Sequence, residues 1–202
     1  MRNVFKAAAI VALVATTAVG QTAPLTGKTA KKILFSPRGT EFTIVQQDFM
    51  TQADVDTLNL MSGMKEFKSV FYYGAIAASP SDGLANKTTV ATADHHSIEA
   101  ADNAAMAECN NLRSGGAKCV VVAHIAPKKY VPRELQLSAS ASAAFKKIYL
   151  KGRGAKAMAT SPSTGVFAIS KGDGAAEAAM ATCAAKAAEK GGSDCQIVIQ
   201  DQ

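Results

Sequence analysis

The sequence is poor in aromatic residues and in charge. It contains no Trp, and aromatic residues make 6% and charged residues 19% of its 202 residues. Apolar residues make 48%, which argues against disorder, but that share leans on alanine, so the core must be built from small side chains. This composition excludes a collagen-like chain, a multi-span membrane protein and a large cofactor enzyme.

Recognisable catalytic motifs are also lacking. The chain has no G-x-S-x-G, C-x-x-C or H-E-x-x-H motif and no EF-hand loop. The segment Gly172-Asp173-Gly174 lacks the further glycine and the parallel β-α-β unit that a dinucleotide-binding turn requires, so we interpret it as a strand-to-helix turn in which Asp173 caps the helix. We therefore assign no catalytic residue and no cofactor.

The N-terminus has the pattern of an export signal. Arg2 and Lys6 precede 13 uncharged residues, 7–19, and small residues stand at positions 18 and 20. We predict a signal peptide over residues 1–20, cleaved before Gln21, and a periplasmic or extracellular mature chain. The alternative, a membrane anchor, is disfavoured because a span needs about 20 apolar residues.

Export determines how the four cysteines are interpreted. In an oxidising compartment an even number of cysteines favours disulfides, and four allow three pairings. A zinc site of four thiolates is the alternative, but it lacks a C-x-x-C pair. The cysteines are Cys109, Cys119, Cys183 and Cys195.

Two stretches of the chain, 73–125 and 155–199, match each other in order. Each contains a Ser-Pro-x-x-Gly turn, an Ala-Met-Ala-x-Cys segment and a Gly-Gly-x-x-Cys segment, and each ends in an apolar run. Three ordered matches predict a tandem duplication. The matching pieces are residues 79–83 and 161–165, 105–109 and 179–183, and 115–119 and 191–195.

Each matching stretch predicts the order β-β-α-β. A strand, the Ser-Pro turn and a second strand form a hairpin, and an alanine-rich helix and a last buried strand follow. The expected strands are 73–78, 84–91 and 120–122 in the first unit and 155–160, 166–170 and 197–199 in the second. Ser97 should cap the first helix, and Gly115 and Gly191 should end the two helices. The predicted fold class is α+β, with antiparallel hairpins and one helix in each unit.

The same pattern selects the cysteine pairing. In each unit one cysteine lies on the inner stripe of the helix and the other stands at the start of the following strand. A helix that returns on its sheet brings these points together, which pairs Cys109 with Cys119 and Cys183 with Cys195. Loops of this size suggest about 3 kcal/mol per disulfide.

The remaining segments complete the predicted organisation. Residues 32–36 and 42–47 look like a further hairpin, and Thr51 and Asp54 resemble a capping box that opens a helix, which together suggest a diverged third copy. Residues 21–30 are expected to be a loose terminus. The predicted parts are the signal peptide 1–20, the N-terminal region 21–70, repeat unit 1 over 71–127, a basic connector 128–154, and repeat unit 2 over 155–202.

A cluster of titratable residues, Asp94-His95-His96, lies where the first unit is longer than the second. Such a cluster can bind a transition metal or hold a general base. The alternative is a solvated loop tip, since no second cluster completes a metal shell. His124, in the last strand of the first unit, is expected to be a packed or edge residue.

The basic connector is the second candidate site. Residues 128–156 hold eight basic residues and one acidic residue, Glu134, with aromatic residues between them, a pattern that can bind a polyanion. The alternative is a solvated connector with a helix over 138–148. The candidate polyanion-binding residues are Lys128, Lys129, Arg133, Lys146, Lys147, Lys151, Arg153 and Lys156.

The Tyr-Gly-Ala-Ile-Ala strand, the Ser-Pro-x-x-Gly turn and the alanine-rich helix ending in Cys resemble a family of secreted bacterial domains of unknown function. The resemblance implies export, disulfides and a small α+β fold, and no reaction. Exported alphaproteobacterial proteins that look like this chain often carry the label 5-aminolevulinate synthase, an activity whose pyridoxal-phosphate motifs these residues do not match.

Together these observations predict a non-enzymatic, exported binding module of the bacterial envelope. Its partner would be an unidentified envelope component or a polyanion. The alternative is a small periplasmic hydrolase or metal-dependent enzyme that uses His95 and His96.

Overall fold

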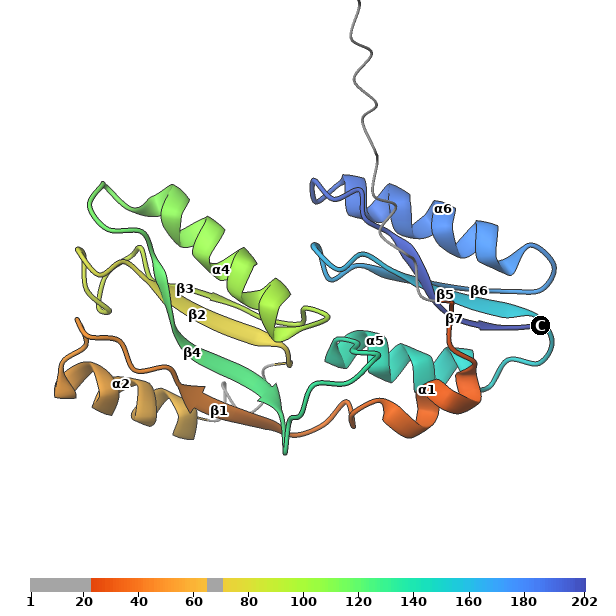
Figure 1. Cartoon of the computed structure of the whole chain (residues 1–202), viewed down its shortest axis with the longest axis horizontal. Coiled ribbons are helices and arrows are strands. Elements are labelled where there is room, and N and C mark those ends of the chain that lie inside the picture. The colour runs from red at the N-terminus through yellow and green to blue at the C-terminus, as the bar shows by residue number, and fades with distance from the viewer. Residues whose placement is uncertain (1–22, 65–70) are drawn as a thin grey trace, which may run out of the picture.

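The chain folds into an α+β structure with two antiparallel sheets, five α-helices among the described residues, and two disulfides. A computed structural model describes residues 23–64 and 71–202, so the predicted signal peptide lies outside the described residues. The two sheets lie side by side along the long axis of the molecule (Figure 1). Within the described ranges, no helix has the length and apolar character needed to cross a membrane.

The first sheet has the strand order β1-β4-β2-β3 and a helix on each face. Alanines 75 and 77 of β2 face α4, whereas Ile76 and Ala78 face α2, as the alternation of side chains along a strand requires. The strands are β1 (Thr40–Ile44), β2 (Gly74–Ala78), β3 (Val90–Thr92) and β4 (Val120–Pro127), and the helices are α2 (Gln52–Gly63) and α4 (Ile98–Leu112).

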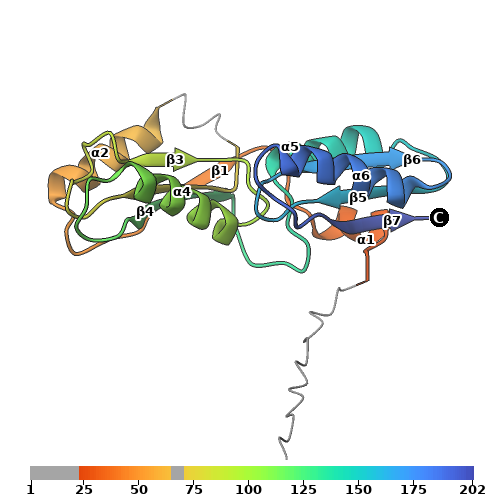
Figure 2. The same ribbon diagram turned by 90° about the horizontal axis from the view of Figure 1, so that it is seen from above.

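The second sheet has the order β6-β5-β7 and is covered in the same way. Ala157 and Ala159 of β5 face α6, whereas Met158 faces α1, α5 and the π-helix η1. Figure 2 shows α4 and α6 on the same side of the two sheets. The elements are β5 (Lys156–Thr160), β6 (Phe167–Lys171), β7 (Gln196–Asp201), α1 (Gly27–Ile33), α5 (Ala139–Ala144), η1 (Phe145–Tyr149) and α6 (Ala175–Ala188).

Small side chains form the contact between helix and sheet in both halves of the molecule, where the first half is the first sheet with α2 and α4 and the second half is the second sheet with α1, α5, η1 and α6. Ala101, Ala105 and Cys109 of α4 are buried against the alanines of β2, and α6 buries Ala179 and Cys183 against β5. Small residues therefore form these two helix–sheet contacts. The prediction that the whole core is built from small side chains is wrong, because the aromatic side chains of Tyr72, Tyr73, Phe145 and Tyr149 are fully buried as well. Leu112, the last residue of α4, is 48% exposed, so the buried stripe of this helix ends at Cys109.

Two local details of the hairpins and caps differ from the prediction. The second strand of the first half comprises only Val90–Thr92, because residues 84–89 form turns in which the Thr89 hydroxyl donates to the Leu84 carbonyl at 2.6 Å. The cap of α6 is Gly174, at φ +69°, and not Asp173. Gly174 fits this left-handed conformation because it has no Cβ.

The helix ends were predicted correctly in one half only. After α6, the Gly191 N–H donates to Ala188 and the Gly192 N–H to Ala187, at 3.0 and 2.8 Å, with Gly191 in the left-handed region. This is the glycine-ended cap that the sequence predicts. α4 instead ends at an extended Arg113, two residues before Gly115.

The N-terminal region contradicts its prediction. Residues 27–33 form α1, capped by Thr26, so this part is neither a loose terminus nor the start of a hairpin. β1 pairs with β4, in a long-range contact that a local pattern does not encode. The capping box of Thr51 and Asp54 is confirmed at the start of α2.

The same N-terminal segment connects the two halves. Leu25 bridges to Ile199 of the second sheet, and the chain then runs through α1 to β1 in the first sheet. The first half therefore cannot be separated from the second by cutting the chain at one point.

Candidate functional site

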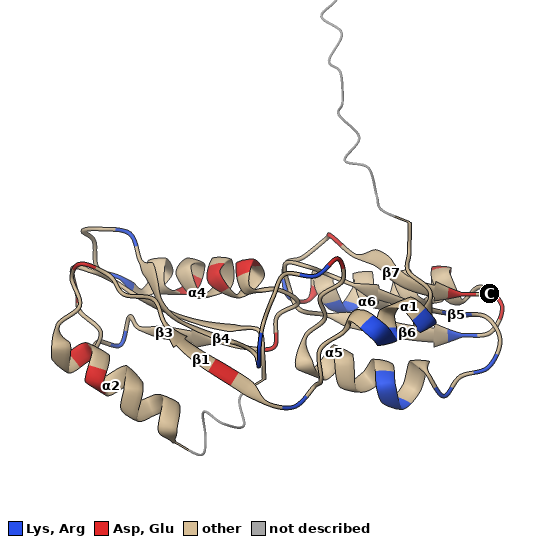
Figure 3. Cartoon of the chain, turned by 60° about the horizontal axis from the view of Figure 1, so that its bottom comes forward, with Lys and Arg blue, Asp and Glu red and all other residues tan. Residues whose placement is uncertain are grey.

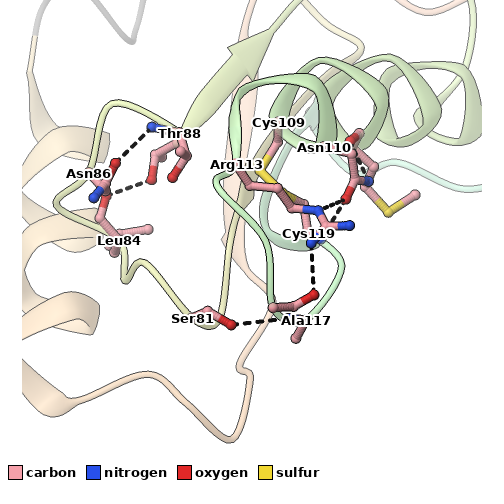
Figure 4. The surroundings of a disulfide bond; sticks show 12 residues. Ser81, Leu84, Asn86, Thr88, Cys109, Asn110, Arg113, Ala117 and Cys119 are labelled. Carbon is pink, nitrogen blue, oxygen red and sulfur yellow. Dashed lines mark hydrogen bonds between the residues drawn. A yellow bond between two sulfur atoms is a disulfide. The ribbon is translucent and has the colours of Figure 1, made fainter.

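The disulfides are Cys109–Cys119 and Cys183–Cys195, the pairs expected from the sequence. Disulfides are compatible with an exported protein. In the first half, the loop before Cys119 contacts the Ser-Pro turn: the Ala117 N–H donates to Ser81 Oγ at 3.0 Å, and Asn110 Oδ1 accepts from the Cys119 N–H at 3.1 Å (Figure 4). The turn, the loop and the disulfide therefore form one structural cluster.

The second half holds its turn through a carboxylate. Asp194 accepts hydrogen bonds from the Ser163 N–H at 2.8 Å, from the Ser163 hydroxyl at 2.9 Å and from the Ser161 hydroxyl. Partial burial raises the pKa of Asp194, but these hydrogen bonds outweigh it and hold the pKa below its ordinary value. The Ser-Pro and Gly-Gly segments of the sequence thus serve structure in both halves.

Asp94 and His95 lie at the junction of the two halves. Asp94, at φ +64°, accepts hydrogen bonds from the Ser140 N–H at 3.0 Å and from the Ser140 hydroxyl, at the start of α5. The backbone N–H of His95 donates to the Tyr73 carbonyl at 3.0 Å. His95 Nδ1 is buried without a hydrogen-bond partner among the described residues, and burial lowers the pKa of this side chain.

His96 is 5% exposed and both of its ring nitrogens are engaged. Nδ1 accepts from the Ser138 N–H at 3.0 Å, and Nε2 lies 3.0 Å from the Val166 carbonyl oxygen. The alternative prediction, that residues 94–96 form a solvated loop tip, is therefore wrong, because the second half packs on this segment. Both nitrogens of His96 are occupied, and no group of three His, Cys, Asp or Glu side chains in the described ranges is placed to hold a metal.

The third histidine, His124, packs against α4. Its Nε2 lies 2.8 Å from Asp102 Oδ1, and both side chains are 24% exposed. This pair ties β4 to α4, in agreement with the packed position expected for His124.

A cavity of about 190 Å³, which the sequence did not reveal, lies beside His96. Segments from the N-terminus, the connector and the second half line it together, so no local pattern could have indicated it. Its polar lining residues include Glu134, Gln136, Thr160 and Gln196.

The structure divides the predicted basic connector into separate groups. Arg133 donates to the Ile33 carbonyl and stacks on the Phe35 ring, and Lys156 Nζ lies 3.5 Å from Asp201 Oδ2. Lys128 and Lys129 follow β4, where the Lys129 N–H donates to Glu41. The connector residues that remain exposed around η1 are Lys146, Lys147, Lys151 and Arg153.

Four further basic residues join this exposed group. α1 packs beside η1, since a Cβ on Gly27 would lie 2.8 Å from the Tyr149 ring, and the position of a Cβ on Gly152 is 3.0 Å from Lys171 Cε. Figure 3 shows blue segments on α1 and around η1 on the same side of the molecule. The added residues, all exposed, are Lys28, Lys31, Lys32 and Lys171.

We call these eight residues the basic face. Residues 27–33 and 139–156, which carry seven of the eight, contain no acidic residue. The contribution of α1 was missed because residues 21–30 were expected to be a loose terminus. The Thr26 cap was the signal that could have found this helix.

No family model, curated protein or solved structure matches the chain. The resemblance to secreted bacterial domains therefore stays a prediction. The function has to be inferred from the geometry and charge of the described residues.

Proposed function

We propose that the protein is an exported, non-enzymatic binding module that holds a polyanion of the bacterial envelope on its basic face. The observation that carries this proposal is the convergence of lysines from α1 and η1, segments more than 100 residues apart in sequence, on one surface. Exposed positive charges attract a polyanion and release its counterions when they bind it.

The scaffold under the basic face favours a preformed site. Ala30 of α1 and Phe145 and Tyr149 of η1 belong to one buried cluster with Met158 and Ile199 of the second sheet. Because these helices are fixed by a shared core, the lysine backbones do not have to be ordered when a ligand binds. Ile148, 47% exposed between Lys147 and the buried Tyr149, offers an apolar contact beside the charges.

Retention on a heparin column at rising salt tests the proposal. The face variant replaces Lys31, Lys32, Lys146 and Lys147 by Gln, and we expect it to elute at a lower salt concentration than the wild type. Each lost phosphate- or sulfate-type contact also reduces the slope of log affinity against log salt by roughly 0.7–0.9.

A matched control separates the basic face from net charge. The control variant replaces Lys87, Lys118, Lys186 and Lys190 by Gln, which removes the same charge from exposed positions on other elements, including α6 on the opposite face of the second sheet. Elution of this variant close to the wild type supports the proposal. Equal shifts for both variants would mean that net charge alone explains retention.

We also propose that the two halves arose by tandem duplication of a β-β-α-β unit. Three features support this: the corresponding strand orders β4-β2-β3 and β7-β5-β6, a register shift after the third residue of β2 and of β5, and a disulfide from each helix to the loop before the last strand. An experimental structure in which the two units failed to superpose would contradict the duplication.

A further inference from the structure

The segment Asp94–His96 joins three parts of the chain. It lies between β3 and α4 of the first half, it contacts the start of α5, and it packs on the turn before β6. The position of a Cβ on Gly165 is 3.0 Å from the Asp94 carbonyl oxygen, so the backbone of the turn before β6 is in close contact with the backbone of this segment. His96 is the buried side chain that bonds to both neighbouring parts.

The hydrogen bonds of His96 fix its protonation state. Ser138 offers a backbone N–H, so Nδ1 must accept, and Val166 offers a carbonyl oxygen, so Nε2 must carry the ring proton. A neutral ring therefore satisfies both partners. A second proton on Nδ1 would face the Ser138 N–H, donor against donor, and would place a charge in a site that is 5% exposed.

The groups that face His96 favour its neutral form on balance. Burial is the largest effect and lowers the pKa of His96, and the charge on His95 lowers it further. The Val166 carbonyl and the carboxylates of Asp94 and Asp194 act in the opposite direction but do not outweigh burial. Both carboxylates already accept hydrogen bonds from serines.

Two more charged side chains lie around the junction. Glu134 shares the cavity wall with His96 and is exposed to solvent, which screens its charge. Lys190, beyond the end of α6, lowers the pKa of His95 and so disfavours a positive charge on this segment.

We propose that His96 is a pH-sensitive latch, which holds the second half against the first while its ring is neutral and releases it on protonation. Opening breaks the bonds of His96 to Ser138 and Val166. It also separates the start of α5 from the first half, where the Ala139 N–H donates to the Tyr72 carbonyl at 3.1 Å and the Ser140 N–H donates to Asp94 at 3.0 Å. Each half keeps its own sheet and its own disulfide. His96 and its partners Ser138 and Val166 are not residues of the basic face, so the latch does not rest on the proposed function.

The direction of the pH effect follows from linkage. The closed form binds the proton less well than the open form, in which His96 is solvated with a pKa of about 6.5. The opening equilibrium is therefore constant above this pH and grows by up to about tenfold for each pH unit below it, until the closed form also takes up the proton.

Hydrogen exchange of the Ser138 amide, measured by NMR on the wild-type protein and corrected for the intrinsic rate, tests the latch. We expect constant protection above about pH 6.5 and a loss of up to tenfold per pH unit below it, while amides of β2 and β5 keep theirs. The ring nitrogens of His96 should show the Nε2–H form at neutral pH. Constant Ser138 protection down to about pH 4.5, or a His96 that titrates at its ordinary pKa, would overturn the proposal.

Two variants assign the effect to one ring. His96→Gln removes the titration but keeps a donor for the Val166 carbonyl, so Ser138 protection should become independent of pH. His95→Gln, the neighbouring control, should keep the pH dependence of Ser138 protection. An unchanged pH dependence in His96→Gln, or its loss in His95→Gln, would overturn the assignment, and the wild-type titration decides the matter if His96→Gln does not fold.

Discussion

Gly192→Ala tests whether the absence of a side chain at Gly192 allows the Ser-Pro turn over residues 161–165 to pack against the loop before Cys195. A Cβ at this position would lie 2.3 Å from Thr164 Cγ2, 3.2 Å from Ser163 Oγ and 3.3 Å from Ser161 Oγ. The first distance is far below a van der Waals contact, so the turn or the loop must shift. Overpacking of this kind costs about 1–3 kcal/mol.

The turn has little freedom to give way. Thr164 Oγ1 lies 2.7 Å from Ser161 Oγ, and the Asp194 carboxylate binds the same serine, so the methyl group cannot rotate away without breaking these bonds. Thr164→Ser removes the clashing methyl group and keeps the hydroxyl. We therefore expect Thr164→Ser to restore most of the stability lost in Gly192→Ala, as a coupling of about 1–2 kcal/mol in a double-mutant cycle.

Urea unfolding, followed by circular dichroism, gives the free energy of unfolding of the wild type, the two single variants and the double variant. Thermal unfolding gives a second measurement, because each kcal/mol of lost free energy of unfolding lowers the melting temperature of a chain of this size by roughly 2–4 °C. A Gly192→Ala variant as stable as the wild type would refute the steric role of Gly192, and so would a double variant that shows the plain sum of the two single effects.

Three further predictions concern the sulfurs, the carboxylate of the turn and export. Replacing Cys183 and Cys195 together by Ala should lower the free energy of unfolding by about 3 kcal/mol, since the disulfide closes a 12-residue separation, and a loss below about 1 kcal/mol in urea unfolding would contradict the chain-entropy account. Because hydrogen bonds lower the pKa of Asp194 in the folded protein, its contribution to stability should be present above its ordinary pKa of 3.8 and disappear as the pH falls below that value. Asp194→Asn should remove this part of the pH dependence, and a wild-type acid profile in the variant would contradict it. Mass spectrometry of the exported protein should find a chain that begins at Gln21 and has no alkylatable thiol; an intact residue 1 or a free thiol would contradict the predicted processing.

Short-range patterns explain most of what the sequence predicted correctly. The caps at Thr51 and Ser97 are bonds to backbone within three residues, so they can be recognised without knowing the fold. The disulfides could be assigned because helix and following strand are neighbours in sequence, 10 or 12 residues apart. In these cases the local chain already contains both partners of the contact.

Long-range partners explain what was missed. Nothing near β1 indicates that it pairs with β4, about 80 residues later in the chain, and nothing near His96 indicates that its ring donates a hydrogen bond to the Val166 carbonyl. The basic segment was recognised by its composition, but Arg133 and Lys156 proved to be internal contacts, while α1 supplied lysines from the other end of the chain. Composition predicted that charge gathers here, and the tertiary structure decides which charges share a surface.

The two halves differ in charge on one side of their sheets and not on the other. α4 and α6 cover the same side of their sheets and both pack through alanines and a cysteine. The opposite sides differ: α2, under the first sheet, carries Asp54 and Asp56 and no basic residue, whereas α1 and η1, under the second, carry five lysines and no acidic residue (Figure 3). Packing requirements account for the similar sides. Because packing does not require surface charges of opposite sign, this contrast favours a ligand that contacts the second half, and a polyanion is the ligand that the charge would attract.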